Sequence, residues 1–266
     1  MQRFDPPSRH CAGGGQHLDS KTFHAKATSG NSVILDIRND YEYDVGHLDG
    51  AIQLPVATYT QSWGALDGIL ESRREELRYK DVLLYCTGGV RCELASAYVK
   101  QKLKEDAADV VRDSLAAGGQ RGAAQKGKES SLHEARGPPV YQLDGGIHRY
   151  LEDFPDGGAF RGKLFVFDAR VTTCARSLGS DAAGSVAASA EDEVVGRCID
   201  CSSPWDQFSG LVVCTVCRAL VLVCPDCITL VGEYHCIRHR DIKDCYFSKL
   251  DCFSKAALAS QKETLQ

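Results

Sequence analysis

The spacing of hydrophobic residues predicts an α/β domain in the first half of the chain. Apolar runs at 33–35 and 82–85 are typical of short buried strands, and a further run starts at Val140. Residues 60–78 and 93–103 place hydrophobic side chains at helical spacing. We therefore expect a doubly wound sheet of about five mostly parallel strands with helices on both faces.

Stretches without such a pattern divide the chain into segments. Residues 1–17 are polar and glycine-rich, and residues 105–137 lose the apolar period, so we expect a disordered tail and a flexible insertion there. The predicted segments are the tail 1–17, the α/β domain 18–152 with its insertion 105–137, an extension 153–174, an Ala/Ser/Gly-rich linker 175–193, a cysteine-rich module 194–245 and a C-terminal tail 246–266.

The overall composition excludes some classes of protein. The 266 residues carry a net charge of −5, so the chain as a whole has no electrostatic attraction for nucleic acid. No apolar run approaches the roughly 18 residues that a membrane-spanning helix needs, so we expect no membrane span. The N-terminus lacks the apolar core of a secretory signal, so we expect a cytoplasmic protein.

A cysteine at the end of the run 82–85 is the candidate nucleophile. Cys86 enters a short loop that leads directly into the predicted helix, where several backbone N–H groups converge. The loop consists of Thr87, Gly88, Gly89 and Val90 and ends at Arg91. The two glycines permit positive φ, and Arg91 adds a positive charge, so we expect a lowered pKa and a nucleophilic thiolate at Cys86. The alternative is a small buried core cysteine.

Several motifs together resemble the rhodanese family. They are LDIR at 35–38, YEY at 41–43, GHLDGA at 46–51, Cys-x-x-Gly-x-Arg at 86–91 and VYQLDGGI at 140–147. The resemblance covers residues 18–152 and implies that Cys86 carries a persulfide, taken from a small donor such as thiosulfate or another persulfide. Four residues separate Cys86 from Arg91, as in the sulfurtransferase form, whereas the related dual-specificity phosphatases have one residue more.

Four residues near this loop have two possible roles each. Asp36 and Arg38 follow a strand and either brace the Cys86 loop or form a structural ion pair. His47 is a general base or a structural histidine. Cys92, directly after the loop, is a resolving thiol for a Cys86 persulfide or a packing residue.

Residues 86–93 and the cysteine-rich tail resemble a narrower group, the rhodanese-like proteins related to bacterial tRNA uridine hydroxylases and their eukaryotic thiosulfate-sulfurtransferase-like relatives. The resemblance implies tRNA as a possible partner, with hydroxylation of the wobble uridine by the same cysteine. That group normally carries a small N-terminal domain before the rhodanese part, and here about 17 residues precede it. The main hypothesis is sulfur transfer; tRNA modification and a non-enzymatic interaction module are the alternatives.

The cysteine-rich module predicts two structural zinc ions. Four pairs have two intervening residues each, the spacing with which one knuckle gives two ligands to a tetrahedral metal: Cys198 and Cys201, Cys214 and Cys217, Cys224 and Cys227, Cys236 and His239. The intervening runs 211–213 and 220–223 are predicted as short strands. The spacing leaves open which pairs combine, and His235 and Cys245 are substitutes for His239. Disulfides or free thiols are the alternative.

Overall fold

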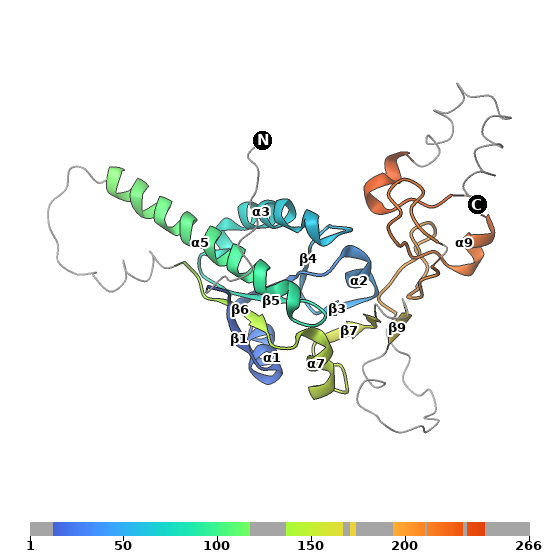
Figure 1. Ribbon diagram of the computed structural model, residues 1–266, viewed down its shortest axis with the longest axis horizontal. Helices are drawn as coiled ribbons and strands as arrows, with labels where there is room; N and C mark the ends of the chain where they lie inside the picture. Colours follow the sequence, from blue (N-terminus) through green and yellow to red (C-terminus); the bar gives the residue numbers. More distant parts are fainter. Residues whose placement is uncertain are drawn as a thin grey trace.

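A computed structural model describes residues 13–117, 137–166, 171–173, 194–210, 212–230 and 233–242. It contains an α/β domain built on a central sheet and, beside it, the cysteine-rich module (Figure 1). Among these residues, no helix is both long and apolar enough to cross a membrane.

The central sheet has five strands, and every neighbouring pair is parallel. Its order is β1 (Gln16–Leu18), β6 (Val140–Leu143), β5 (Asp81–Tyr85), β2 (Ser32–Asp36) and β4 (Ile52–Gln53). The register places Asp36 opposite Tyr85, so the carboxyl ends of β2 and β5 lie side by side. The predicted fold class is confirmed.

Alternate residues of β5 enter two separate cores, as expected for a strand buried on both faces. Val82 and Leu84 pack with α3 (Ser62–Ser72) and the start of α5 (Val90–Ala117). Leu83 and Tyr85 belong to the other core, which includes residues of α1 (Ser20–Thr28) and α7 (Gly146–Asp153). The helices on both faces are visible in Figure 1.

The remaining elements lie around this framework. They are α2 (Asp40–Val45), the 3-10 helix η1 (Tyr59–Gln61), α4 (Arg74–Leu77), the antiparallel pair β3 (Gly46–Leu48) and β7 (Phe160–Gly162), the antiparallel pair β8 (Leu164–Val166) and β9 (Val171–Thr173), α9 (Pro225–Leu230) and the 3-10 helix η2 (Ile237–Ile242).

Two predicted segment boundaries and two predicted strands differ from the structure. Residues 16–17, assigned to the tail 1–17, belong to β1, a three-residue edge strand too short to give a clear alternation. Residues 105–117, assigned to the insertion 105–137, continue α5, because alanine, of which this stretch has four, is the strongest helix former. In place of the predicted strands at 211–213 and 220–223, the described residues 212, 213 and 220–223 form one isolated bridge, Val213 with Leu220; residue 211 lies outside the described residues.

Other predicted segments fall partly or wholly outside the described residues. These are residues 1–12 of the tail, 118–136 of the insertion, 167–170 and 174 of the extension, the linker 175–193, residues 243–245 of the module and the C-terminal tail 246–266.

A buried polar network ties the carboxyl ends of β2 and β5 together. The carboxylate of Asp36 accepts a hydrogen bond from the Tyr85 hydroxyl at 2.6 Å and from Nε of Arg38 at 2.9 Å. Arg38 also donates to the carbonyl of Gly46, the first residue of β3. Both charged side chains are fully buried and compensate each other's charge. The network therefore fixes the end of the strand that leads into Cys86.

Candidate functional site

Cys86 lies between the end of β5 and the start of α5, as the sequence predicted. Its side chain is 1% exposed. Gly89 adopts a φ of +85°, which favours glycine, whereas Gly88 has no positive φ. Only one of the two loop glycines is therefore needed for the conformation that we expected of both. Val90 is 80% exposed at the rim of the loop.

Backbone N–H groups in the first turn of α7 donate hydrogen bonds to the Cys86 loop. The N–H of Ile147 donates to the carbonyl of Cys86 at 2.8 Å, and the N–H of His148 donates to the carbonyl of Thr87 at 3.1 Å. Gly146 has a φ of +68°, and a Cβ there would lie 2.5 Å from the carbonyl oxygen of Thr87. The Gly-Gly segment thus allows the close approach that satisfies the loop carbonyls and leaves the loop amides turned the other way.

A buried carboxylate holds the arginine of the loop. Both guanidinium Nη atoms of Arg91 donate to Glu42 of α2, at 2.7 and 2.9 Å. The hydroxyl of Thr87 donates to the same carboxylate at 2.8 Å, and Arg91 donates to that hydroxyl at 2.9 Å. Burial opposes the ionised form of Glu42, but the hydrogen bonds and charge of Arg91 outweigh it and lower the pKa of the carboxyl.

The surroundings of Cys86 lower its pKa to about 6. The largest cause is a hydrogen bond from the Cys92 thiol; the charge of Arg91 and the backbone N–H groups of Cys92 and Arg91 act in the same direction, against the effect of burial. Burial and the hydrogen bond to Cys86 raise the pKa of Cys92 well above its usual range. Cys92 is therefore a protonated donor beside an ionised Cys86 at neutral pH.

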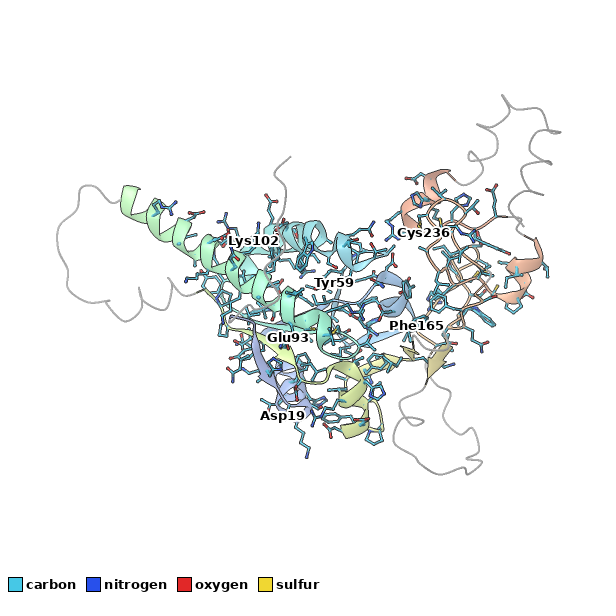
Figure 2. All side chains as sticks on the ribbon, viewed as in Figure 1. Asp19, Tyr59, Glu93, Lys102, Phe165 and Cys236 are labelled. Carbon is cyan, nitrogen blue, oxygen red and sulfur yellow. The ribbon has the colours of Figure 1, made fainter. Side chains whose placement is uncertain are left out.

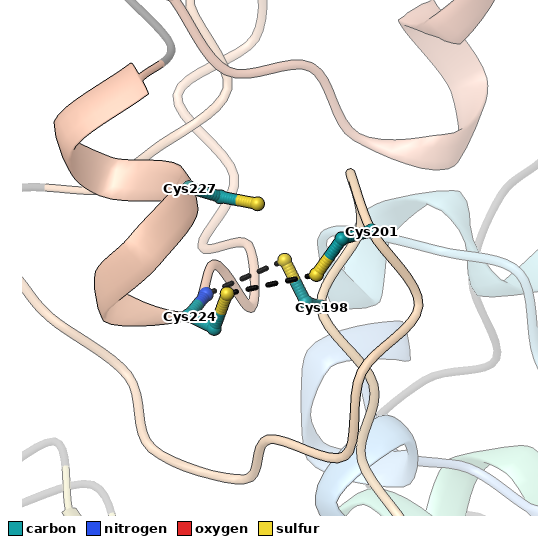
Figure 3. A group of neighbouring side chains, drawn as sticks. All are labelled: Cys198, Cys201, Cys224 and Cys227. Carbon is teal, nitrogen blue, oxygen red and sulfur yellow. Dashed lines mark hydrogen bonds between the residues drawn. The ribbon is translucent and has the colours of Figure 1, made fainter.

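The second chemical feature consists of two clusters in the cysteine-rich module. Figure 3 shows the side chains of Cys198, Cys201, Cys224 and Cys227 pointing toward one another. Cys214, Cys217, Cys236 and His239 form the other group. Within each group the candidate ligand atoms lie within 4.8 Å of one another, a spacing that could hold a metal ion. The structure thus combines the pair Cys198 and Cys201 with Cys224 and Cys227. It combines the pair Cys214 and Cys217 with Cys236 and His239.

Among the described residues, the fourth ligand position of the second group is taken by His239. His239 directs Nδ1 toward the sulfur atoms of Cys214 and Cys236, at 3.5 and 3.3 Å. His235 lies outside both groups, and Cys245 lies outside the described residues. The seven cysteines of the two groups are all free, so the disulfide alternative does not describe these residues.

Family models match most of the described chain. A model described as "Rhodanese-like domain" matches residues 19–153, and one described as "Rhodanase C-terminal" matches residues 161–240. The chain belongs to the rhodanese family. The boundaries of the two models separate the rhodanese domain from a C-terminal region that contains both cysteine-rich groups up to His239.

Named relatives extend across both parts. The "Rhodanese-like domain-containing protein 6" of Arabidopsis thaliana is 34% identical over 229 residues, which cover 84% of this chain and 32% of that protein. A "tRNA uridine(34) hydroxylase" of Corynebacterium glutamicum is 31% identical over 231 residues, covering 86% of this chain and 58% of that protein. The chain therefore spans between about a third and three fifths of the length of these relatives.

Solved structures also match the rhodanese domain. A Saccharomyces cerevisiae protein, described as "a homolog of single-domain rhodanese and Cdc25 phosphatase catalytic domain", is 15% identical, with 56% of this chain and 88% of that chain covered and a TM-score of 0.39. The assignment to the family depends on the sequence matches and not on this value.

Within the rhodanese domain, the residues with two predicted roles have distinct contacts. Asp36 and Arg38 form the expected ion pair, and Asp36 braces the loop indirectly through Tyr85. The imidazole of His47 stacks on Tyr43 with ring centroids 3.8 Å apart, and its Nδ1 lies 3.0 Å from the Tyr43 carbonyl oxygen. These contacts support a structural role for His47.

Two residues of the site were not among the predicted ones. Glu42 reaches Arg91 across 49 positions of sequence, and nothing in the local pattern of YEY at 41–43 marks it. The Tyr59 hydroxyl donates to the carbonyl of Arg91 at 2.9 Å.

We expect Gly146→Ala to destabilise the rhodanese domain. Its Cβ would overlap the carbonyl oxygens of Cys86 and Thr87 at a positive φ, so the loss should be roughly 3 kcal/mol. Gly88→Ala is the matched control, because the space around Gly88 is open. Thermal unfolding followed by circular dichroism measures both. Equal midpoints for the two variants would contradict the close approach of α7 to the loop.

We expect Cys92→Ala to raise the pKa of Cys86 above about 6, because the thiolate loses its largest stabilising hydrogen bond. Alkylation by iodoacetamide follows the thiolate fraction, so the rate at pH 5.5 should fall by about tenfold. Mass spectrometry of the Cys86 peptide measures this rate at each pH. If the pKa of Cys86 in Cys92→Ala equals that of the wild type, the hydrogen bond from Cys92 does not stabilise the thiolate.

Proposed function

We propose that the chain is a cysteine enzyme of the rhodanese type, in which Cys86 accepts a sulfane sulfur. The observation that supports this most directly is the position of Cys86 between β5 and α5, beside Cys92, Arg91 and backbone N–H groups that lower its pKa to about 6 and favour the ionised sulfur at neutral pH. The Cys86 thiolate attacks the outer sulfur of thiosulfate, the S–S bond of the donor breaks, and sulfite leaves with the electron pair. The product is a Cys86 persulfide, which an acceptor thiolate can attack in turn.

The state of Arg91 favours sulfur over phosphate as the group transferred. Glu42 already occupies both Nη atoms of Arg91, and the Thr87 hydroxyl donates to the same carboxylate. A phosphate dianion would require those donors for itself. The loop between Cys86 and Arg91 has four residues. Both features fit a terminal sulfur held by backbone amides better than a phosphate ester.

A second proposal is modification of tRNA by the same cysteine. Relatives named tRNA uridine(34) hydroxylase match 86% of this chain, including the cysteine-rich region. If the same activity is present here, Cys86 would act on uridine 34 of tRNA. A third possibility, a non-enzymatic interaction module, does not account for a buried thiol held in its ionised form.

We also propose that each cysteine-rich group binds one zinc ion with a structural role. Thiolate and imidazole are ligands that suit zinc, and four of them close the coordination sphere. Sulfur pairs such as Cys201 with Cys224 and Cys217 with Cys236 are 3.6 Å apart. A tetrahedron with Zn–S bonds of about 2.3 Å has edges of about 3.8 Å, so these two sulfur pairs are close to the spacing that zinc requires.

The sulfur-transfer proposal predicts a persulfide on Cys86. After incubation with thiosulfate, the intact mass of the protein should increase by one sulfur atom, and Cys86→Ala should show no increase. Cyanide should then remove the added sulfur as thiocyanate and restore the original mass. An adduct that persists in Cys86→Ala, or no adduct in the wild type, would contradict the assignment.

The tRNA proposal is tested in a bacterial strain that lacks its own tRNA uridine(34) hydroxylase. Expression of the chain should restore hydroxylated uridine 34, measured by mass spectrometry of tRNA nucleosides, and Cys86→Ala should not. Restoration without a thiosulfate adduct supports tRNA as the substrate. If neither a thiosulfate adduct nor restored hydroxylation is found, the interaction module remains as the explanation.

For the metal, we expect two zinc equivalents per chain by elemental analysis. Cys201→Ala with Cys224→Ala removes two ligands of one group and should leave one equivalent. Cys201→Ala with Cys214→Ala damages both groups and should leave none. If the first double variant lost both equivalents and the second lost only one, the grouping of Cys201 with Cys224 in one site and Cys214 in the other would be contradicted. A value near zero in the wild type would refute zinc.

A further inference from the structure

The short helix α2 lies between the Cys86 loop and the cysteine-rich module. Glu42, in its first turn, contacts Arg91 and Thr87 of the loop. Asp40 and Val45, at its two ends, contact groups on the side of the module. Figure 1 shows α2 at the edge of the rhodanese domain that faces the module. Six residues are too few to form a stable helix alone, so packing at both ends fixes its position.

The first end is held by an ion pair from a metal-binding knuckle. Arg238 lies in η2 between the candidate ligands Cys236 and His239, and its guanidinium donates to the carboxylate of Asp40. Both side chains are partly buried, at 26% and 13% exposure, so solvent screens this pair less than a surface pair. The carboxylate of Asp40 also accepts the N–H of Tyr41 at 2.8 Å.

The second end is held by Lys163, between β7 and β8, and by Phe165 of β8. The N–H of Lys163 donates to the carbonyl of Val45 at 2.8 Å, and its ammonium lies 3.1 Å from the carboxylate of Asp206. Val45, Phe165 and Leu222 form one buried hydrophobic cluster. Phe165 lies where the two parts of the molecule meet (Figure 2).

Tyr41, the second residue of α2, also contacts the module. The ring of Tyr41 meets Phe208 edge-on, with centroids 6.2 Å apart, and Phe165 at 5.1 Å. The module therefore contacts α2 at Asp40, Tyr41 and Val45, and Glu42 extends from the same helix to the loop.

We propose that the cysteine-rich module positions Glu42 and thereby helps to keep Cys86 ionised, with Arg238 and Asp40 as the positioning residues that connect the two sites. The inference deepens the proposed function because it concerns the same cysteine. If α2 loosens, Glu42 no longer fixes Arg91 and Thr87, and the charge of Arg91 is not held beside the sulfur. Structural metal ions in the knuckles then affect the reactive thiol through a continuous chain of contacts.

The test compares two arginines of η2. Arg238→Gln removes the ion pair with Asp40, whereas Arg240→Gln makes the same change of charge at an exposed position of the same short helix. The readout is the alkylation rate of Cys86 against pH, measured on the Cys86 peptide together with the zinc content. The charged or titratable groups that face Cys86 are Arg91, Cys92 and Tyr59, all unchanged in these variants.

We expect Arg238→Gln to slow alkylation at pH 5.5 by about threefold and to raise the apparent pKa of Cys86, with Arg240→Gln unchanged. Asp40 lies outside the module, so Asp40→Asn should raise the pKa of Cys86 in the same way while both metal equivalents are retained. This variant therefore tests the ion pair even if Arg238→Gln loses zinc. The double variant with Arg238→Gln and Asp40→Asn should slow alkylation no more than the stronger of the two single variants, because both changes break the same ion pair.

The proposal is overturned if Asp40→Asn titrates like the wild type, or if Arg238→Gln and Arg240→Gln are indistinguishable. These measurements do not depend on sulfur transfer. If no persulfide forms but the pKa of Cys86 shifts in Asp40→Asn, the proposed function is refuted and the coupling between the two sites stands. If a persulfide forms but the pKa of Cys86 does not shift in Asp40→Asn, only the coupling is refuted.

Discussion

A negative charge on a buried sulfur must be compensated by nearby donors, and the arrangement of the rhodanese domain around Cys86 follows from this requirement. The side chain is 1% exposed, yet its pKa is lowered to about 6. Hydrogen bonds from Cys92 and backbone amides, together with the charge of Arg91, outweigh the burial. Such donors stabilise a thiolate only if they are held in place before the charge forms.

Separate parts of the chain hold those donors. The end of β5 is fixed by the Asp36–Tyr85 hydrogen bond, and α7 satisfies the carbonyls on the far side of the loop. On the near side, Glu42 of α2 orients Arg91 and Thr87. Because α2 is itself fixed by contacts with the cysteine-rich module, the two regions that the family models describe separately act on one site.

The sequence revealed those features that depend on residues close together along the chain. The strand, loop and helix around Cys86 are contiguous, and each cysteine knuckle spans four residues, so periodicity and spacing were sufficient. Glu42 and the combination of knuckles depend on how distant segments meet, which spacing does not encode. The extension of α5 to Ala117 was missed because residues 105–117 show no sustained apolar period in the sequence.

The most direct test of this account is the titration of Cys86 in the wild-type protein. The rate of alkylation by iodoacetamide, followed on the Cys86 peptide by mass spectrometry, should rise with a midpoint at a pH of about 6 and be nearly constant above neutrality. A midpoint near 8.5, the ordinary value for a cysteine thiol, would show that the donors around the loop do not stabilise the thiolate and would contradict the account.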